Sequence, residues 1–125
     1  MSSGWNGNKK RGIGFKYAWR GILTVTKTER NMKYHLIIAT IVLVCSMIMQ
    51  ISRVEWAIVL LVIGLVLTME MINTSLEKAM DHLSPDIHPT VGMVKDIAAG
   101  AVLIAALLSV IIGLMIFIPK LVAFF

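Results

Sequence analysis

The chain has 125 residues, which is enough for a single domain over 1–125. Hydrophobic residues make up 58% of it, a larger share than the roughly half found in soluble domains, and they gather in long runs. The formal net charge is +5, but no folded basic face stands apart from these runs, which argues against a nucleic-acid-binding protein.

The first 33 residues carry eight basic side chains and a single acidic one, Glu29. Between residues 14 and 30, Phe15, Trp19 and Ile22 recur at three- and four-residue steps, and the basic side chains fall elsewhere. This pattern predicts an amphipathic helix that lies in a membrane interface. Glu29 continues the apolar stripe of that helix, so its carboxylate needs a cationic partner or a metal ion.

Three long apolar runs follow, over about residues 34–52, 54–80 and 96–118. Each has, or reaches by extension, the ~20 residues that a helix needs to cross a bilayer. A buried core helix is the alternative for any one run, but so short a chain has too little polar surface to cover three of them in water. We therefore predict an all-α membrane protein with three transmembrane helices and an N-terminal amphipathic surface helix.

Positive charge is unevenly distributed over the segments that join the spans. Lysines and histidines cluster between the second and third spans, whereas the turn between the first two holds one basic residue, Arg53. The positive-inside rule then places the N-terminus and the second loop in the cytoplasm and the C-terminus outside. Pro85, Pro89 and Gly92 predict that this loop covers residues 82–93.

Polar side chains line one face of the second span where its apolar run ends. Glu70, Asn73, Glu77 and Asp81 lie at i, i+3, i+7 and i+11, which aligns them on one side of a helix. Glu70 is the deepest, and an ionisable group at such depth is costly and usually functional. Oxygen donors of this kind suit Mg²⁺, which also bridges substrate phosphates.

The alternative is a purely structural helix end, in which these side chains form ion pairs with Lys78 and Lys95. We favour that interpretation for Asp81. Lys95 could instead hold phosphate oxygens, and Asp96, at the predicted start of the third span, would be stabilised by the helix dipole. Together with the acidic face and the Lys95-Asp96 pair, three more residues complete a predicted metal- and phosphate-binding cluster: Glu29, Asp86 and His88.

The glycine-rich nucleotide motifs of soluble proteins are absent, and the histidines lack the spacing of a zinc site. The segment E-x-x-N-T-S-L-E-x-x-M-D, from Glu70 to Asp81, instead resembles the signature of small bacterial membrane lipid kinases. These are the prokaryotic diacylglycerol kinases and undecaprenol kinases. The resemblance extends over nearly the whole chain, through G-F-K-Y-A-W-R at 14–20, Glu29, residues 86–88 and K-D-x-A-A-x-A-V at 95–102.

This resemblance implies a homotrimer whose active sites are shared between subunits. It implies that Glu70 is the catalytic base and that Glu29 and Glu77 hold Mg²⁺ on the phosphates of ATP. The residues implied for the nucleotide site are Tyr17, Glu29, Asn73, Glu77, Asp86, Ile87, His88, Lys95 and Asp96. Those implied for the lipid substrate are Lys10, Phe15, Trp19, Glu70 and Ala99.

The chain departs from some relatives at one position. They carry an arginine just before the surface helix, where this chain has Lys9, Lys10 and Arg11. We take Lys10 as the candidate, and the other two stay open as alternatives.

We predict ATP- and Mg²⁺-dependent phosphorylation of a membrane lipid alcohol. Undecaprenol is preferred because Glu29, Arg30-Asn31 and Tyr34-His35 resemble the undecaprenol-using branch; diacylglycerol is the alternative. A small proton-coupled transporter is the alternative from another class, and a non-catalytic scaffold is a further one. A transporter needs ionisable groups near mid-membrane, whereas here they cluster at one end of a span. Three helices are too few to enclose both ATP and a lipid, so size alone also predicts an oligomer.

Overall fold

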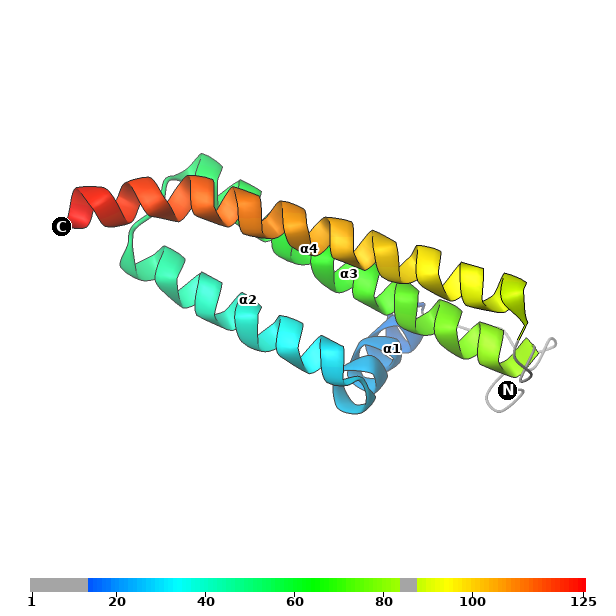
Figure 1. The fold of residues 1–125 in the computed structure, drawn as a ribbon. Helices are drawn as coiled ribbons and strands as arrows, with labels where there is room; N and C mark the ends of the chain where they lie inside the picture. Colours follow the sequence, from blue (N-terminus) through cyan, green and yellow to red (C-terminus); the bar gives the residue numbers. More distant parts are fainter. Residues whose placement is uncertain (1–13, 84–87) are drawn as a thin grey trace.

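The computed structural model describes residues 14–83 and 88–125, and these ranges are almost entirely helical (Figure 1). The last three helices are long and apolar enough to cross a membrane, which confirms the predicted all-α architecture with three spans. The four helices are α1 (Gly14–Thr28), α2 (Arg30–Ile48), α3 (Arg53–Leu83) and α4 (Pro89–Phe124).

The membrane-length helices start or end outside the apolar runs that predicted them, and α2 also ends at Ile48, four residues before its run does. Helix α2 starts four residues earlier than expected, at Arg30, and α3 runs on to Leu83. Helix α4 covers Pro89–Phe124 rather than 96–118. Hydropathy marks the part of a helix that crosses hydrocarbon, whereas the backbone stays helical wherever nothing interrupts its hydrogen bonds.

The predicted loop over 82–93 is wrong at both of its ends, because α3 includes residues 82–83 and α4 begins at Pro89. Proline is favourable in the first turn of a helix, where its missing N–H costs nothing. The ring nitrogen Nδ1 of His88 caps this turn by accepting a hydrogen bond of 3.1 Å from the backbone N–H of Thr90. Asp96 therefore lies about two turns inside α4, and the predicted stabilisation by the helix N-terminus is wrong.

A break separates α1 from α2 at Glu29, so the predicted helix over 14–30 is two residues too long. Glu29 has extended backbone angles (φ −102°, ψ 121°) and precedes the first turn of α2. The last turn of α1 is rich in β-branched residues, which are poor helix formers. Hydroxyl groups there also bond back to carbonyls four residues earlier, as Thr28 does to Thr24 at 2.8 Å. Glu29 thus lies at a joint and not on the face of a helix.

At the opposite end of the molecule, a tight turn joins α2 to α3. Gln50 has a positive φ of 52° in this turn. Ser52 and Glu55 then form a reciprocal cap, in which the Ser52 N–H donates to the Glu55 carboxylate at 2.9 Å and the Glu55 N–H donates to the Ser52 hydroxyl at 3.1 Å. Glu55 also pairs with Lys120 of α4 at 3.1 Å, and a small apolar core of Ile51, Val59 and Ile116 fills the space beside this turn.

Helix α4 packs closely beside α3, whereas α2 lies farther from α3 (Figure 1). The face of α4 against α3 carries small buried residues, Ala98 and Ala105, which let two helices approach closely in lipid. The outer faces are apolar and exposed: Ile41, Leu61 and Met115 each expose more than half of their surface. Such a surface fits a bilayer better than water.

Candidate functional site

The polar end of the bundle comprises the α1–α2 joint, the last turns of α3 and the first turns of α4. Glu70 is its most buried acid, with 2% of its surface exposed. The Asn31 side chain on α2 forms a hydrogen bond with the Glu70 carboxyl. His35, also on α2, and the carboxylates of Glu29 and Glu77 lie close enough to interact with it electrostatically. The structure therefore brings together the three acids that the sequence singled out, from two separate segments of the chain.

The polar face of α3 continues from Glu70 towards Leu83. The Asn73 amide donates a hydrogen bond of 3.0 Å to the Glu77 carboxylate, which confirms that these two residues share one face. Asn73 and Thr74 are each only 7% exposed. Among the described residues, nothing bonds to the Asn73 carbonyl oxygen or to the Thr74 hydroxyl. Buried polar atoms without a partner are rare and often mark places where water or a ligand binds.

Thr74 was missed by the sequence analysis. Its only signal is its position four residues after Glu70, which places the two residues on adjacent turns of one helix face. Hydroxyl groups elsewhere in the described helices, such as those of Thr40 and Ser46, donate to the carbonyl four residues earlier, but the Thr74 hydroxyl does not. It thus keeps a free hydrogen-bonding group beside the acids.

Two ion pairs connect the elements of the polar end. Lys95 of α4 pairs with Asp81 of α3, and this is one of the ion pairs that the structural interpretation of the helix end predicted. Lys78, which the sequence also offered as a partner for the acidic face, pairs instead with Glu29 at 3.5 Å. The cationic partner that Glu29 was expected to need therefore comes from α3.

The donor chemistry of Glu29 and Glu77 fits Mg²⁺. Within residues 14–83 and 88–125, no three histidine, cysteine or acidic side chains gather into a complete metal site. Mg²⁺ is rarely bound by an all-protein cage; it usually takes one or two carboxylates and completes its coordination with water and substrate phosphates. Glu29 and Glu77, which both interact electrostatically with Glu70, offer two such carboxylates at the polar end.

The other nucleotide candidates lie in α1 and around the start of α4. Tyr17 is half-buried beneath the guanidinium of Arg20, which lies 5.4 Å from its ring centre. His88 caps α4, and the exposed Asp96 follows Lys95 on the same helix. Three further candidates, Lys10, Asp86 and Ile87, fall outside the described residues.

The lipid candidates in the described part of the chain are exposed apolar residues. Phe15 and Trp19 stack on each other along α1, with ring centres 6.5 Å apart, and expose 74% and 53% of their surfaces. Ala99 is exposed on α4. Stacked aromatic rings on one side of a short helix are well suited to the headgroup region of a bilayer.

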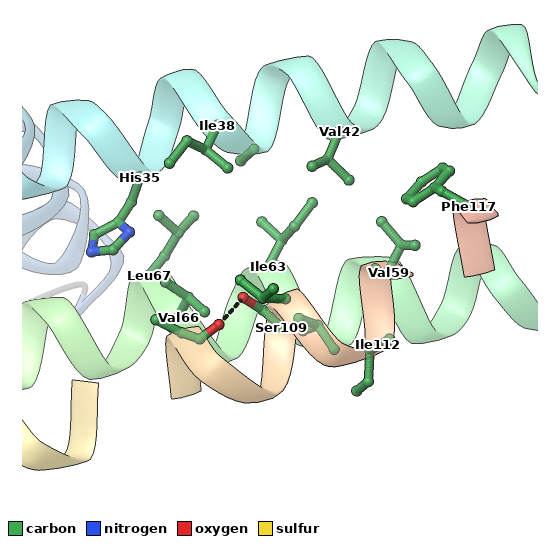
Figure 2. A pocket seen from close by; sticks show the side chains of 15 residues that line it. His35, Ile38, Val42, Val59, Ile63, Val66, Leu67, Ser109, Ile112 and Phe117 are labelled. Atoms are coloured by element: carbon green, nitrogen blue, oxygen red, sulfur yellow. Dashed lines mark hydrogen bonds between the residues drawn. The ribbon is translucent and has the colours of Figure 1, made fainter. Parts of the chain in front are cut away.

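An apolar cavity of about 270 Å³ lies between α2, α3 and α4 (Figure 2). Its lining is almost wholly aliphatic, with His35 at one end and Phe117 at the other. The hydroxyl of Ser109 is already committed to the Ala106 carbonyl, at 2.7 Å. Leu67, which lies about one helical turn before Glu70 on α3, also lines the cavity, so the cavity begins close to the buried acid. Three helices build it, so it could not be predicted from the spacing of residues along the chain.

Apolar outer faces and a buried acid at one end define a small multi-pass membrane protein with a polar site close to the edge of its apolar region. The family described as prokaryotic diacylglycerol kinase matches residues 16–117. The chain belongs to this family, and it is a lipid kinase. The resemblance seen in its sequence motifs is confirmed.

Individual relatives divide between two lipid substrates. The chain is 43% identical to the undecaprenol kinase of Bacillus subtilis over 107 residues, which are 86% of this chain and 87% of that protein. It is 32% identical to the diacylglycerol kinase of Synechocystis over 89% of this chain and 64% of that protein. The diacylglycerol kinase of Escherichia coli is 23% identical over 76% of this chain and 78% of its own length.

Proposed function

We propose that this lipid kinase uses ATP and Mg²⁺ to convert undecaprenol to undecaprenyl phosphate. The observation that carries the proposal is the buried Glu70 carboxyl, which lies at the boundary between the polar end and an apolar cavity. A membrane alcohol and a cytosolic nucleotide have to meet at such a boundary. The 43% identity to the undecaprenol kinase of Bacillus subtilis supports the choice of lipid, and diacylglycerol is the alternative substrate.

In this proposal Glu70 is the general base. The lipid hydroxyl oxygen forms a bond to the γ-phosphorus of ATP, the bond from that phosphorus to the bridging oxygen of ADP breaks, and Glu70 takes the hydroxyl proton. Asn31 and His35 on α2, which interact with the Glu70 carboxyl, would hold it in place for the incoming alcohol. Phosphoryl transfer depends mostly on positioning and on the neutralisation of charge, which suits a site made of a few fixed side chains.

Glu29 and Glu77 would hold the magnesium ion, and Asn73 fixes Glu77 through its amide. Mg²⁺, when bound, neutralises the charge of the ATP phosphates. Lys95 contributes a positive charge beside them. The remaining nucleotide contacts in the proposal come from Tyr17, Asp86, Ile87, His88 and Asp96.

The lipid would approach sideways from the bilayer, past α1. Phe15 and Trp19 hold α1 at the membrane surface, and Ala99 and Lys10 complete the lipid side of the site. The aliphatic cavity beyond His35 offers an apolar path for the first part of the tail. The protein acts as a homotrimer with shared active sites, because one subunit has too few helices to enclose both substrates.

The direct test is transfer of the γ-phosphate of labelled ATP to undecaprenol by the purified protein in mixed micelles. We expect labelled undecaprenyl phosphate and lipid-dependent release of ADP. Proton movement across vesicles without any nucleotide consumption would support the transporter instead, and inactivity in both assays would support a scaffold.

We expect the N-terminus and the loop between α3 and α4 to face the cytoplasm, because the basic residues concentrate there. A reporter enzyme fused after Phe125 should then be active only outside the cytoplasm, and one inserted between Leu83 and Pro89 only inside. The reverse pattern would place the polar end away from cytosolic ATP and would contradict the proposed kinase site.

We expect Glu29→Gln and Glu77→Gln to raise the Mg²⁺ concentration needed for half-maximal activity, because each removes a hard oxygen ligand. Asp81→Asn is the matched control: it makes the same chemical change on α3, but at an acid that is paired with Lys95. Its Mg²⁺ dependence should stay close to that of the wild type. Equal shifts in all three variants would argue against Glu29 and Glu77 as the ligands.

A further inference from the structure

The ion pair between Lys78 and Glu29 has no assigned part in the proposed reaction. Their Nζ and Oε1 atoms lie 3.5 Å apart, and the pair joins α3 to the α1–α2 joint. The Lys78 side chain is 65% exposed and that of Glu29 is 28% exposed. The lysine can therefore swing away into solvent without any rearrangement of the helices, whereas Glu29 is held more closely.

Glu29 faces two kinds of cation in the proposed function. An Mg²⁺ ion would bind the Glu29 oxygens at ~2 Å, whereas the Lys78 ammonium group lies 3.5 Å from Oε1. Two cations on one carboxylate repel each other. In addition, Glu70 interacts electrostatically with Glu29 and Glu77 at the polar end, so the negative charges of these acids attract either cation when it lies beside Glu29. The two cations are therefore alternatives at Glu29.

We propose that the ammonium group of Lys78 competes with the divalent cation for Glu29 and so sets the cation concentration that the enzyme requires. The inference rests on Glu29 being a metal ligand, as in the proposed function. Lys78 neutralises Glu29 when no metal is bound and leaves it when the metal arrives. An exposed ion pair is typically worth ~0.2–1 kcal/mol, so its loss should change cation affinity by about 1.5- to 5-fold.

The test is titration of the purified full chain in detergent micelles with Mn²⁺ alone, followed by the electron paramagnetic resonance signal of the free ion. Lys78→Gln should lower the Mn²⁺ Kd by about 1.5- to 5-fold. Lys33→Gln is the matched control, because Lys33 lies one turn after Glu29 in α2 and loses the same charge. It should change the Kd less. Lys78→Arg preserves the pair and should bind Mn²⁺ like the wild type.

The competition also predicts coupling between the two positions. In a Glu29→Gln background, Lys78→Gln should no longer improve Mn²⁺ binding, because the carboxylate for which the cations compete is gone. An equal gain in Lys33→Gln, or a gain that persists without Glu29, would reduce the effect to general charge and overturn the proposal. An unchanged Kd in Lys78→Gln would overturn it as well.

Transfer of phosphate to undecaprenol, measured on the same wild-type sample, keeps the two proposals separate. A sample that phosphorylates the lipid while Lys78→Gln binds Mn²⁺ like the wild type disproves only the competition. A sample that phosphorylates no lipid alcohol disproves the proposed function, and the Mn²⁺ titrations still decide the role of Lys78.

Discussion

Replacing Glu70 with glutamine is expected to lower kcat by roughly 10²–10⁴-fold, the usual contribution of a general base. Glutamine keeps the shape of the side chain at a position that is only 2% exposed, but it cannot accept the proton of the lipid hydroxyl. The nucleotide site would be left intact, so ATP should still bind. Initial rates in undecaprenol micelles measure the first effect, and binding of a non-hydrolysable ATP analogue measures the second.

Asp81→Asn serves as the control for Glu70→Gln, because it makes the same change of charge three turns further along α3. It should retain most of the activity. Near-normal turnover in Glu70→Gln would remove Glu70 from the mechanism, and loss of ATP binding together with activity would point to a nucleotide-binding role instead.

The second large effect concerns the choice of lipid. We expect undecaprenol to be phosphorylated with a higher kcat/KM than diacylglycerol when both compete in the same micelles. Each buried ester carbonyl without a hydrogen-bond donor costs ~1–3 kcal/mol, which is a factor of about 5 to 150. The cavity beside Glu70 is aliphatic, and its Ser109 hydroxyl already bonds to Ala106. The plainest donor on the face that we assign to the lipid is the indole N–H of Trp19.

Product ratios from that competition, measured at low conversion, decide the point. Preferential consumption of diacylglycerol would show that donors outside the aliphatic cavity serve the ester groups. The choice of undecaprenol would then be wrong, and the role of Glu70 as a base would stand. Trp19→Phe tests the indole N–H separately: it keeps an aromatic ring at the membrane surface, and it should lower activity towards diacylglycerol more than towards undecaprenol.

The sequence predicted the number and type of the helices because length and apolarity alone decide which segments can cross a bilayer. It also predicted that Asp81 could pair with Lys95, since a short connection brings the end of one helix beside the start of the next. Helix ends were harder to predict. Pro89 looked like a loop residue, yet it opens α4, because proline fits the first turn of a helix as well as it fits a loop.

The surroundings of Glu29 could not be predicted from spacing. A continuous helix would have placed its carboxylate on the apolar stripe of α1, but the break after Thr28 moves it to a joint. Its partner Lys78 lies far along the chain, and only the packing of α1 and α2 near the end of α3 brings the two together. The aliphatic cavity likewise requires three helices at defined separations.

The two ends of the bundle are restrained by different forces. The end around Ile51 is held by buried apolar side chains and by Glu55, which caps α3 and pairs with α4. At the other end the cross-links are solvent-accessible charge pairs, each worth ~0–1 kcal/mol and weakened by salt. Buried residues such as Val25, Met32 and Asn73 also pack around that end, so salt removes only the part of its cohesion that the charge pairs supply.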